Sequence, residues 1–308
     1  MTAVTNPFYT SKAIIPPYSG PRIPQPHAKL PGLLSQIAPD DASADEALHL
    51  TLMSPQFSSW TSRVLLLFEH FRIPYTAEFH NYNNAEGKAV IQGLPARTVP
   101  VLTLGKTLSD LPNGGRQEIH DSMAIMMLMA YELFAEKNIL PKDVRLRRYA
   151  LSIIAEMSTG FSVLRGDYSV NFGLQWDPDG VPRVEGCDRD IDRAIFIFSS
   201  ARKLTKSILP KEEDRGYLFG SFSAADSWYW PLLWRFRTYG LLKGKTLDND
   251  VKKWINKMWN DETTKRIGEE QIREREEGVA TLEYLETLFD PTKKWEWGNW
   301  VDFEVDDE

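Results

Sequence analysis

The first regular pattern along this chain is an alternation of apolar and polar positions. Residues 48–52 place leucine at every second position, which is the period of a half-buried strand. Residues 63–68 form an apolar run with the pattern of a helix, and the Ile-Pro pair at 73–74 ends it because proline disrupts a helix interior. The pattern of residues 75–80 then predicts a second strand.

The following segment predicts two more strands and a helix. Residues 99–104 form a short apolar strand that begins at a proline and is closed by glycine. Residues 118–121 predict a strand that runs into a helix from Ser122 to about Glu136. With a helix in the polar stretch before residue 99, the order is β-α-β-α-β-β-α. This order predicts an α/β domain with a mixed sheet, of the thioredoxin-like kind.

After Pro141 the pattern becomes helical. Residues 148–165 carry apolar positions at helical spacing, and Ser223 with Asp226 forms a capping box before a helix over 228–239. Residues 172–187 are polar, with glycine and proline, and predict a loop insertion that holds Cys187 incidentally. We therefore expect an all-α second domain. Its first helix would bury Leu151, Ile154, Ala155, Met157 and Leu164, and its other helices would span 190–207, 248–259 and 264–288.

These patterns divide the chain into four parts. Residues 1–45 are rich in proline and predict an extended arm, either lying inertly on the domain or covering a site or a partner subunit. Residues 46–137 form the expected thioredoxin-like domain and residues 138–290 the expected all-α domain. Residues 291–308 form an acidic tail.

Composition excludes several classes of partner. The chain has 308 residues, of which 42% are hydrophobic, enough to bury one large core or two ordinary ones. The net charge of −7 and the absence of a basic stripe predict no nucleic-acid partner. With one cysteine and no histidine pair at i,i+4 spacing, we expect no metal site. No signal sequence or run of about 18 apolar residues is present, so we expect a cytoplasmic protein with no membrane partner.

Two places offer binding chemistry. A cis Val99-Pro100 bond would leave the N–H and C=O of Val99 free at a sheet edge, where an extended peptide ligand can pair with them. The alternative is a plain start of an edge strand. Asp121 and Ser122 lie where a strand meets a helix start, and the unpaired N–H groups there suit a carboxylate. The alternative is that these two residues only cap the helix.

A V-P-x-L strand followed by an acidic-Ser-x-Ala-Ile helix start resembles the glutathione S-transferase superfamily. The segment 58–63, Ser-Ser-Trp-Thr-Ser-Arg, resembles the S-S-W-S-x-R signature of a serine-type, zeta-like branch. Residues 155–165 resemble the A-E-M-H-S-G-F-x-x-L-R helix of that branch, and residues 217–226 and 234–240 resemble its F-L-F-G-x-F-S-x-A-D and R-F-R-T-Y-G blocks. The resemblance covers about residues 47 to 290.

Three features depart from the pattern of that branch. Ser158 stands where the family helix has histidine, and Asp121 stands where glutamate or glutamine is commoner. The arm and the segment 172–187 are additional. These extensions suggest a specialised, fungal member, such as a glutathione-dependent isomerase of a pseurotin-type pathway.

The resemblance implies glutathione as the cofactor and a serine that activates its thiol. Ser58 matches the family serine best and Ser59 is the adjacent alternative; the other interpretation is that both serve only as helix caps. A hydrogen bond to the thiolate, worth roughly 1.5–3 kcal/mol, would lower the thiol pKa by about one to two units. The implied glutathione-binding residues are Thr98, Val99, Pro100, Asp121 and Ser122.

The second substrate, a small-molecule electrophile, is expected between the domains. The candidate apolar wall consists of Phe57, Trp60, Met157, Phe161 and Trp228, although aromatic residues at helical spacing are more often core. Arg165 either recognises an anionic or carbonyl group or pairs at the surface.

The implied enzyme is a homodimeric transferase that conjugates glutathione to the electrophile, or an isomerase that inverts an olefin and returns glutathione. Glutathione-dependent ether cleavage or dehalogenation is a third reaction that the sequence does not separate from these. The rival from another class is a non-catalytic binding or regulatory module with the same fold.

Overall fold

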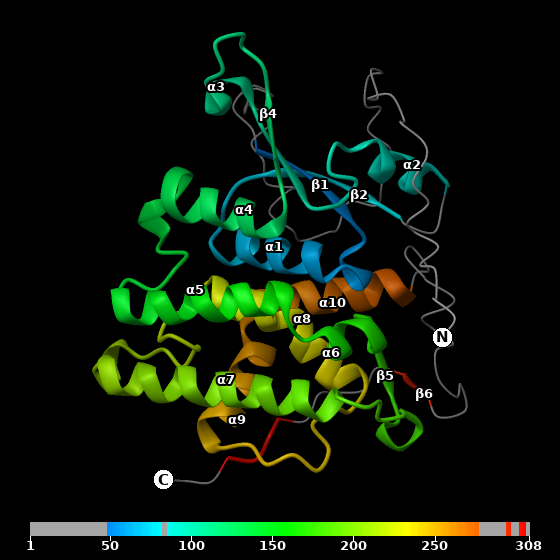
Figure 1. The fold of residues 1–308 in the computed structure, drawn as a ribbon, viewed down its shortest axis with the longest axis vertical. Coiled ribbons are helices and arrows are strands. Elements are labelled where there is room, and N and C mark those ends of the chain that lie inside the picture. Colours follow the sequence, from blue (N-terminus) through cyan, green and yellow to red (C-terminus); the bar gives the residue numbers. More distant parts are fainter. Residues whose placement is uncertain (1–47, 82–84, 277–293, 297–301, 306–308) are drawn as a thin grey trace, which may run out of the picture.

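The fold is that of a computed structural model, which describes residues 48–81, 85–276, 294–296 and 302–305. The predicted arm over 1–45, most of the predicted tail over 291–308 and the end of the helix predicted over 264–288 lie outside the described residues. A sheet with its helices forms the upper part of Figure 1, and a larger helical part lies below it.

The upper part has a four-stranded mixed sheet in the order β2-β1-β3-β4. Strand β1 pairs in parallel with β2 and antiparallel with β3, and β3 pairs antiparallel with β4. The leucines of β1 are buried, as the alternating pattern predicts. The thioredoxin-like prediction is confirmed. The strands are β1 (Leu48–Met53), β2 (Thr76–His80), β3 (Val101–Leu104) and β4 (Gln117–His120).

The expectation of a sheet edge at Val99 and Pro100 is wrong. Strand β3 lies between β1 and β4, so it is an interior strand. It begins at Val101, directly after Pro100, and the Val99–Pro100 peptide bond is cis. Because proline has no N–H to donate to a strand ladder, an interior strand tolerates it only at its first position or just before its start, where Pro100 lies.

Helices α1 and α4 lie between the sheet and the helical part (Figure 1). Helix α1 is buried from Thr61 to Glu69, because the sheet lies on one side of it and α8 and α10 lie on the other. Helix α4 continues into a π-helical turn over Met129–Leu133. The helices of this upper part are α1 (Ser59–His70), α2 (Ala85–Gly93), α3 (Lys106–Ser109) and α4 (Ser122–Leu128).

The lower part is helical, as predicted. Helices α5, α8 and α10 face α1 and α4, and α7 and α9 lie farther from the sheet (Figure 1). Every residue of α8 is buried. The helices are α5 (Val144–Thr159), α6 (Ser162–Asp167), α7 (Cys187–Ile208), α8 (Ala224–Thr238), α9 (Asn249–Asn260) and α10 (Glu262–Glu276).

The single helix predicted over 148–165 is two helices. Helix α5 ends at Thr159, Gly160 follows as its C-cap, and Phe161 has a positive φ of 56° that reverses the chain into α6. Ala155, predicted to face the core, is exposed. The reason is a shifted apolar face, since the buried residues of α5 are Leu146, Ala150, Ile153, Ile154 and Met157.

The segment 172–187 is not a polar loop insertion. Strand β5 (Leu174–Trp176) pairs antiparallel with β6 (Lys294–Glu296), and Phe172 is fully buried. Cys187 is the first residue of α7 and is also fully buried, so it does not lie in a loop. The polar residues of this segment obscured the apolar ones, which occupy alternate positions.

Two absences hold for the described residues. No helix among them is both long and apolar enough to cross a lipid bilayer. No group of three or more histidine, cysteine, aspartate or glutamate side chains among them is arranged to hold a metal ion.

The predicted capping box is present at the start of α8. Oδ2 of Asp226 accepts hydrogen bonds from the backbone N–H and the hydroxyl of Ser223, at 2.9 and 3.0 Å. Its Oδ1 accepts from the N–H of Leu218 and from Nε1 of Trp254, at 3.0 and 2.9 Å. One fully buried carboxyl group therefore holds the helix start, the preceding loop and α9 together.

Asp226→Ala should lower the free energy of unfolding by about 3 kcal/mol, because the substitution leaves buried N–H donors without acceptors. Urea unfolding followed by circular dichroism measures the change. Asp179→Asn is the control, since Asp179 is exposed and its ion pair with Lys243 lies at the surface. Equal midpoint shifts for the two variants would contradict the prediction.

Candidate functional site

The start of α1 is fixed by the loop that precedes it. Residues 55–57 form one turn of 3-10 helix, and Gln56 is buried, donating from Nε2 to the carbonyl of Gln271 in α10 at 2.8 Å. The carbonyl of Gln56 accepts the N–H of Phe172 at 3.1 Å. The loop is therefore held by the helical part on two sides.

Ser58 is the N-cap of α1. Its Oγ accepts the N–H of Thr61 at 3.2 Å, and its carbonyl accepts the hydroxyl of Ser62 at 2.7 Å. The Ser58 side chain is only 5% exposed. The capping role that the sequence left open for Ser58 is present in the structure.

Ser59, the first residue of α1, has different partners. Its Oγ accepts a hydrogen bond from Nη1 of Arg235, in α8, at 3.1 Å. Its carbonyl accepts Nε of Arg63, one turn farther along α1, at 3.2 Å. Ser59 is half-buried, so its hydroxyl is less enclosed than that of Ser58.

Three arginines gather around this helix start. The guanidinium carbon of Arg63 lies 4.4 Å from the ring centroid of Trp60, and that of Arg165 lies 5.0 Å from the same ring. Arg63 and Arg235 are buried. Arg165 is half-buried and donates to the carbonyls of Ser158 and Gly160, at 2.9 and 3.2 Å.

The electrostatics of the cluster follow from its burial. Burial, together with the charges of Arg165 and Arg235, lowers the pKa of Arg63 to about 9, although the charge of Asp121 acts in the opposite direction. Burial also lowers the pKa of Arg235 to about 10. Both groups remain cationic at neutral pH, so the start of α1 carries a positive potential in addition to the helix dipole.

The three predicted glutathione-binding residues before β3 are consecutive, and they differ in how far they are exposed to solvent. Thr98 is exposed, Val99 is half-buried and Pro100 is buried. Within the described part of the chain, the backbone N–H and C=O of Val99 make no hydrogen bond. Neither group is therefore committed to a partner in the part of the chain that the structure describes.

Asp121 and Ser122 occupy the start of α4. Oδ1 of Asp121 accepts the N–H of Met123 at 2.7 Å, so this carboxylate caps the helix. Ser122 is fully buried, and its Oγ has no hydrogen-bond partner among the described residues. The negative charge of Asp121 also acts to raise the pKa of Arg63, so the Asp121 carboxylate lies within electrostatic reach of the start of α1.

The candidate apolar wall divides into two groups. Phe57 and Trp60 are half-buried and expose surface beside the two serines. Met157, Phe161 and Trp228 are buried in the core, which matches the alternative that the sequence left open for them. Nε1 of Trp228 donates to the hydroxyl of Ser158 at 3.2 Å, so the residue in the family's histidine position acts here as a partner of a core tryptophan.

Sequence reasoning missed Arg63 and Arg235 as parts of this site. Both lie inside quoted motifs, at the end of Ser58–Arg63 and in the Arg-Phe-Arg block of α8. The available signal was an arginine on an otherwise apolar helix, where a buried charge requires a reason.

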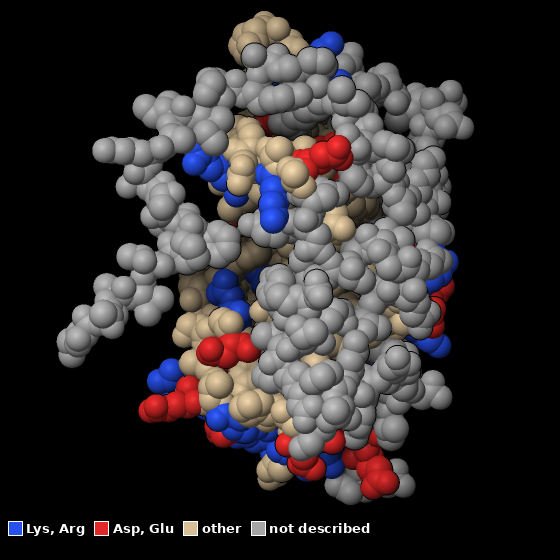
Figure 2. Space-filling view, turned by 90° about the vertical axis from the view of Figure 1, so that its right-hand side faces the viewer, with Lys and Arg blue, Asp and Glu red and all other residues tan. Residues whose placement is uncertain are grey.

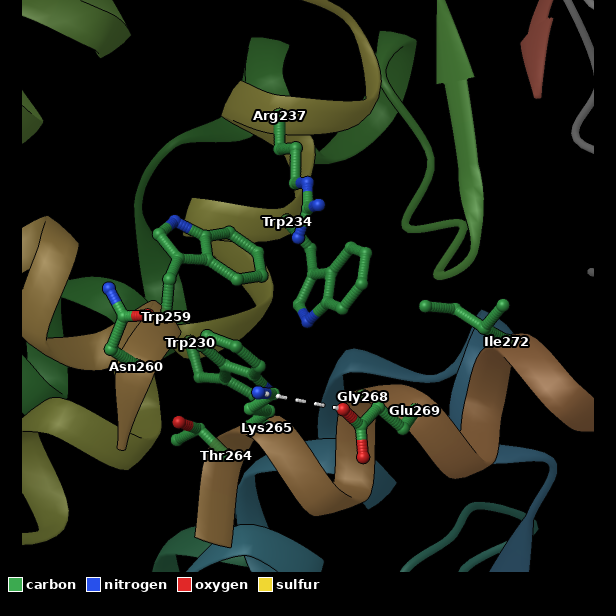
Figure 3. A pocket seen from close by; sticks show the side chains of 10 residues that line it. All are labelled: Trp230, Trp234, Arg237, Trp259, Asn260, Thr264, Lys265, Gly268, Glu269 and Ile272. Atoms are coloured by element: carbon green, nitrogen blue, oxygen red, sulfur yellow. Dashed lines mark ion pairs between the residues drawn. The ribbon is translucent and has the colours of Figure 1, made fainter. Parts of the chain in front are cut away.

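Two cavities formed by the described residues lie away from the start of α1. A groove of about 950 Å³ borders His70, at the opposite end of α1. In the second cavity, of about 280 Å³, indoles from α8 and α9 face α10, and an ion pair between Lys265 and Glu269 closes one side (Figure 3). Neither cavity is lined by the two serines. The smaller cavity is lined by Trp230, Trp234, Arg237, Trp259, Asn260, Thr264, Lys265, Gly268, Glu269 and Ile272.

The molecular surface has a hollow between its upper and lower parts. Figure 2 shows it as a recess of uncharged surface, with lysine or arginine side chains at its border. The recess therefore separates the sheet and its helices above from the helical part below.

Comparison with known proteins identifies one domain of the chain and its fold. Residues 57–130 match the model of the glutathione S-transferase N-terminal domain. The chain is similar to the structure of glutathione transferase Omega 2C from Trametes versicolor, with 17% identity, a TM-score of 0.50 and coverage of 76% of this chain and 100% of that one. It is similar to Ure2p in complex with glutathione, with 15% identity, a TM-score of 0.50 and coverage of 72% and 98%.

A glutathione transferase family member from Pseudomonas fluorescens Pf-5, with two glutathione bound, has 16% identity and a TM-score of 0.49, and the match covers 77% of this chain and 97% of that chain. No curated protein matches the chain by sequence. Residues 57–130 therefore match a glutathione S-transferase N-terminal domain, and the two structures with a TM-score of 0.50 show that the chain has a glutathione transferase fold. Its position in a serine-type, zeta-like branch stays a prediction.

Arg63→Met should leave the free energy of unfolding unchanged or raise it by up to about 2 kcal/mol. Nη1 and Nη2 of Arg63 are buried without partners among the described residues, so an apolar side chain of similar length removes a desolvation cost. Urea unfolding measures the effect.

The matched control is Arg202→Met. Arg202 is also buried, but it makes an ion pair with Asp214 at 2.6 Å. Removing it should cost about 3–5 kcal/mol, because Asp214 is left without a counter-charge. If both variants lost the same free energy of unfolding, the prediction would be wrong, and the charge of Arg63 would stabilise the fold as that of Arg202 does.

Proposed function

We propose that this protein is a glutathione-dependent enzyme that activates the glutathione thiol for addition to a conjugated, electrophilic small molecule. The observation that carries the proposal is the start of α1, where Ser58 and Ser59 meet a positive helix end and a cluster of arginines. A thiol titrates near pH 8.5, and the thiolate is the nucleophile. Hydroxyl donors and nearby cations favour the thiolate, so this helix start has the chemistry that the reaction needs.

The remainder of glutathione would extend from the sulfur along the upper domain. The N–H and C=O of Val99, which make no hydrogen bond to any described residue, are suited to its peptide, as a strand pairs with a strand. Its γ-glutamyl carboxylate would lie at the start of α4, where the Ser122 hydroxyl lacks a partner among the described residues. Asp121 would face the ammonium group. The glutathione found in the structures of Ure2p and the Pseudomonas fluorescens protein gives this ligand its precedent in the fold.

Two reactions begin with the same addition. In conjugation the glutathione sulfur bonds to the electrophilic carbon, a proton is added, and the thioether is the product. In isomerisation the sulfur adds to an enone, the former double bond rotates as a single bond, and loss of the same proton and thiolate restores the olefin with inverted geometry. Isomerisation therefore consumes no glutathione. The resemblance to the zeta-like branch favours it, in a fungal secondary-metabolic role.

We also propose a homodimer. Met127 and Tyr131, in α4 and its π-helical continuation, and Val144, at the start of α5, are large apolar side chains that are 38%, 50% and 46% exposed. A contact between subunits requires such side chains to form one continuous apolar patch, and we propose that these three belong to it.

Ser122→Ala should weaken glutathione binding about tenfold, because one hydrogen bond to a carboxylate is lost. Calorimetric titration of wild type and variant with glutathione measures both dissociation constants. Ser207→Ala is the control, since Ser207 is exposed and bonds only to the carbonyl of Leu204. Absence of heat from the wild type would refute the proposed function and favour a non-catalytic binding module.

The isomerase reaction is tested with a cis-enone, catalytic glutathione and detection of both olefin isomers by chromatography. We expect trans product at more than one turnover per glutathione. Equal turnover without glutathione would refute glutathione chemistry, and consumption of glutathione with thioether formation would indicate conjugation.

A further inference from the structure

We propose that Ser59, oriented by Arg235 of the helical part, is the residue that donates its hydroxyl to the glutathione thiolate, and that Ser58 chiefly caps α1. This inference rests on the proposed function and deepens it. It reverses the assignment that motif position alone favours, because Ser58 is the better match to the family serine.

The hydrogen bonds of the two serines distinguish them. A serine hydroxyl has one proton to donate and two lone pairs that accept. The Ser58 oxygen accepts a neutral backbone N–H from Thr61 and is nearly enclosed. The Ser59 oxygen accepts a charged guanidinium N–H from Arg235 and is half-buried.

When a hydroxyl oxygen accepts a hydrogen bond from a charged group, the same hydroxyl becomes a stronger hydrogen-bond donor. Hydrogen bonds polarise one another in a chain, and those with an ionised partner are the stronger ones. Because Arg235 occupies one lone pair of Ser59, the hydroxyl proton must point elsewhere. In the proposed hydrogen-bond series, Arg235 therefore donates to Ser59, and Ser59 donates to the thiolate.

Arg235 is itself rigidly held. Its Nε donates to the carbonyl of Tyr168 at 2.7 Å, and its Nη1 also donates to the carbonyl of Pro231 at 3.0 Å. The carbonyl of Ser59 is meanwhile held by Arg63. Ser59 is thus fixed at both its hydroxyl and its carbonyl, by arginines from different parts of the fold.

A second observation indicates that an anion belongs at this place. The terminal nitrogens of fully buried Arg63 lack partners among the described residues, beside Trp60 and Ser59. The guanidinium lies over the rings of Trp60 and Trp228, and the charge of Asp121 partly compensates it, but a buried cation without hydrogen-bond partners at its terminal nitrogens is still stabilised by a further anion. The thiolate supplies that negative charge when the thiol proton leaves to solvent, and a sulfur lone pair accepts a hydrogen bond from the Ser59 hydroxyl, which keeps its proton.

Arg235 acts through Ser59, so it is a positioning residue. The measurement is the pKa of bound glutathione, from thiolate absorbance near 240 nm against pH, at saturating glutathione. Ser59→Ala should raise that pKa by about one to two units, and Ser58→Ala by less than half as much. Arg235→Gln should raise it, and Arg235→Lys should restore part of the shift.

A purely structural role for Arg235 would lower stability without moving this pKa. The double variant Ser59→Ala/Arg235→Gln decides the route of action, because coupled residues give non-additive shifts. We expect Arg235→Gln to shift the thiol pKa by less than half as much in the Ser59→Ala background as in the wild type. Fully additive shifts would contradict the inference that Arg235 acts through Ser59.

Should Arg235→Gln fail to fold, the comparison of the two serine variants still decides. A larger shift of the thiol pKa for Ser58→Ala than for Ser59→Ala overturns the inference. If calorimetry still detects glutathione binding by the wild type, the proposed function remains intact. No binding by the wild type overturns both.

Discussion

The structure depends on how one fully buried helix satisfies its polar groups. Helix α8 has no exposed residue, yet it carries Asp226, Ser227 and two arginines. A buried polar group is costly without a partner, so each needs one in a neighbouring element. Asp226 binds the preceding loop and α9, and the Ser227 hydroxyl donates to the carbonyl of Arg63 in α1 at 2.6 Å. Together with the bond from Arg235 to Ser59, these contacts fix α8 against the start of α1.

Much of this arrangement could be predicted from the sequence, because local patterns determine it. Alternating leucines gave β1, and the Ser-x-x-Asp spacing gave the capping box of α8. The interior position of β3 could not be predicted, since strand order depends on pairing between distant segments. The break after Thr159 was also missed, because Phe161 adopts a positive φ that the sequence pattern does not favour for an aromatic residue.

The candidate site divides in the same way. Ser58, Ser59, Val99 and Ser122 are recognisable because they lie within short motifs. The arginines around them come from α1, α6 and α8, and only the packing of these helices brings the guanidinium groups to one place. The contrast between Arg63 and Arg202 separates two uses of a buried cation. Arg202 has its carboxylate within the chain, whereas the terminal nitrogens of Arg63 have no partner among the described residues.

The bonds from α8 to α1 also bear on how such a protein can change during evolution. Domains of a two-domain enzyme are often treated as exchangeable modules, one holding the cofactor and the other setting substrate preference. Here a residue of the helical part contacts the serine pair at the start of α1, and another residue of the same helix contacts the carbonyl of Arg63. A chimera that kept the upper domain and took its helices from a relative without these two residues would inherit the motif but not its geometry. A chimera made from this chain would keep both bonds only if its new helices carried arginine and serine at the positions of Arg235 and Ser227.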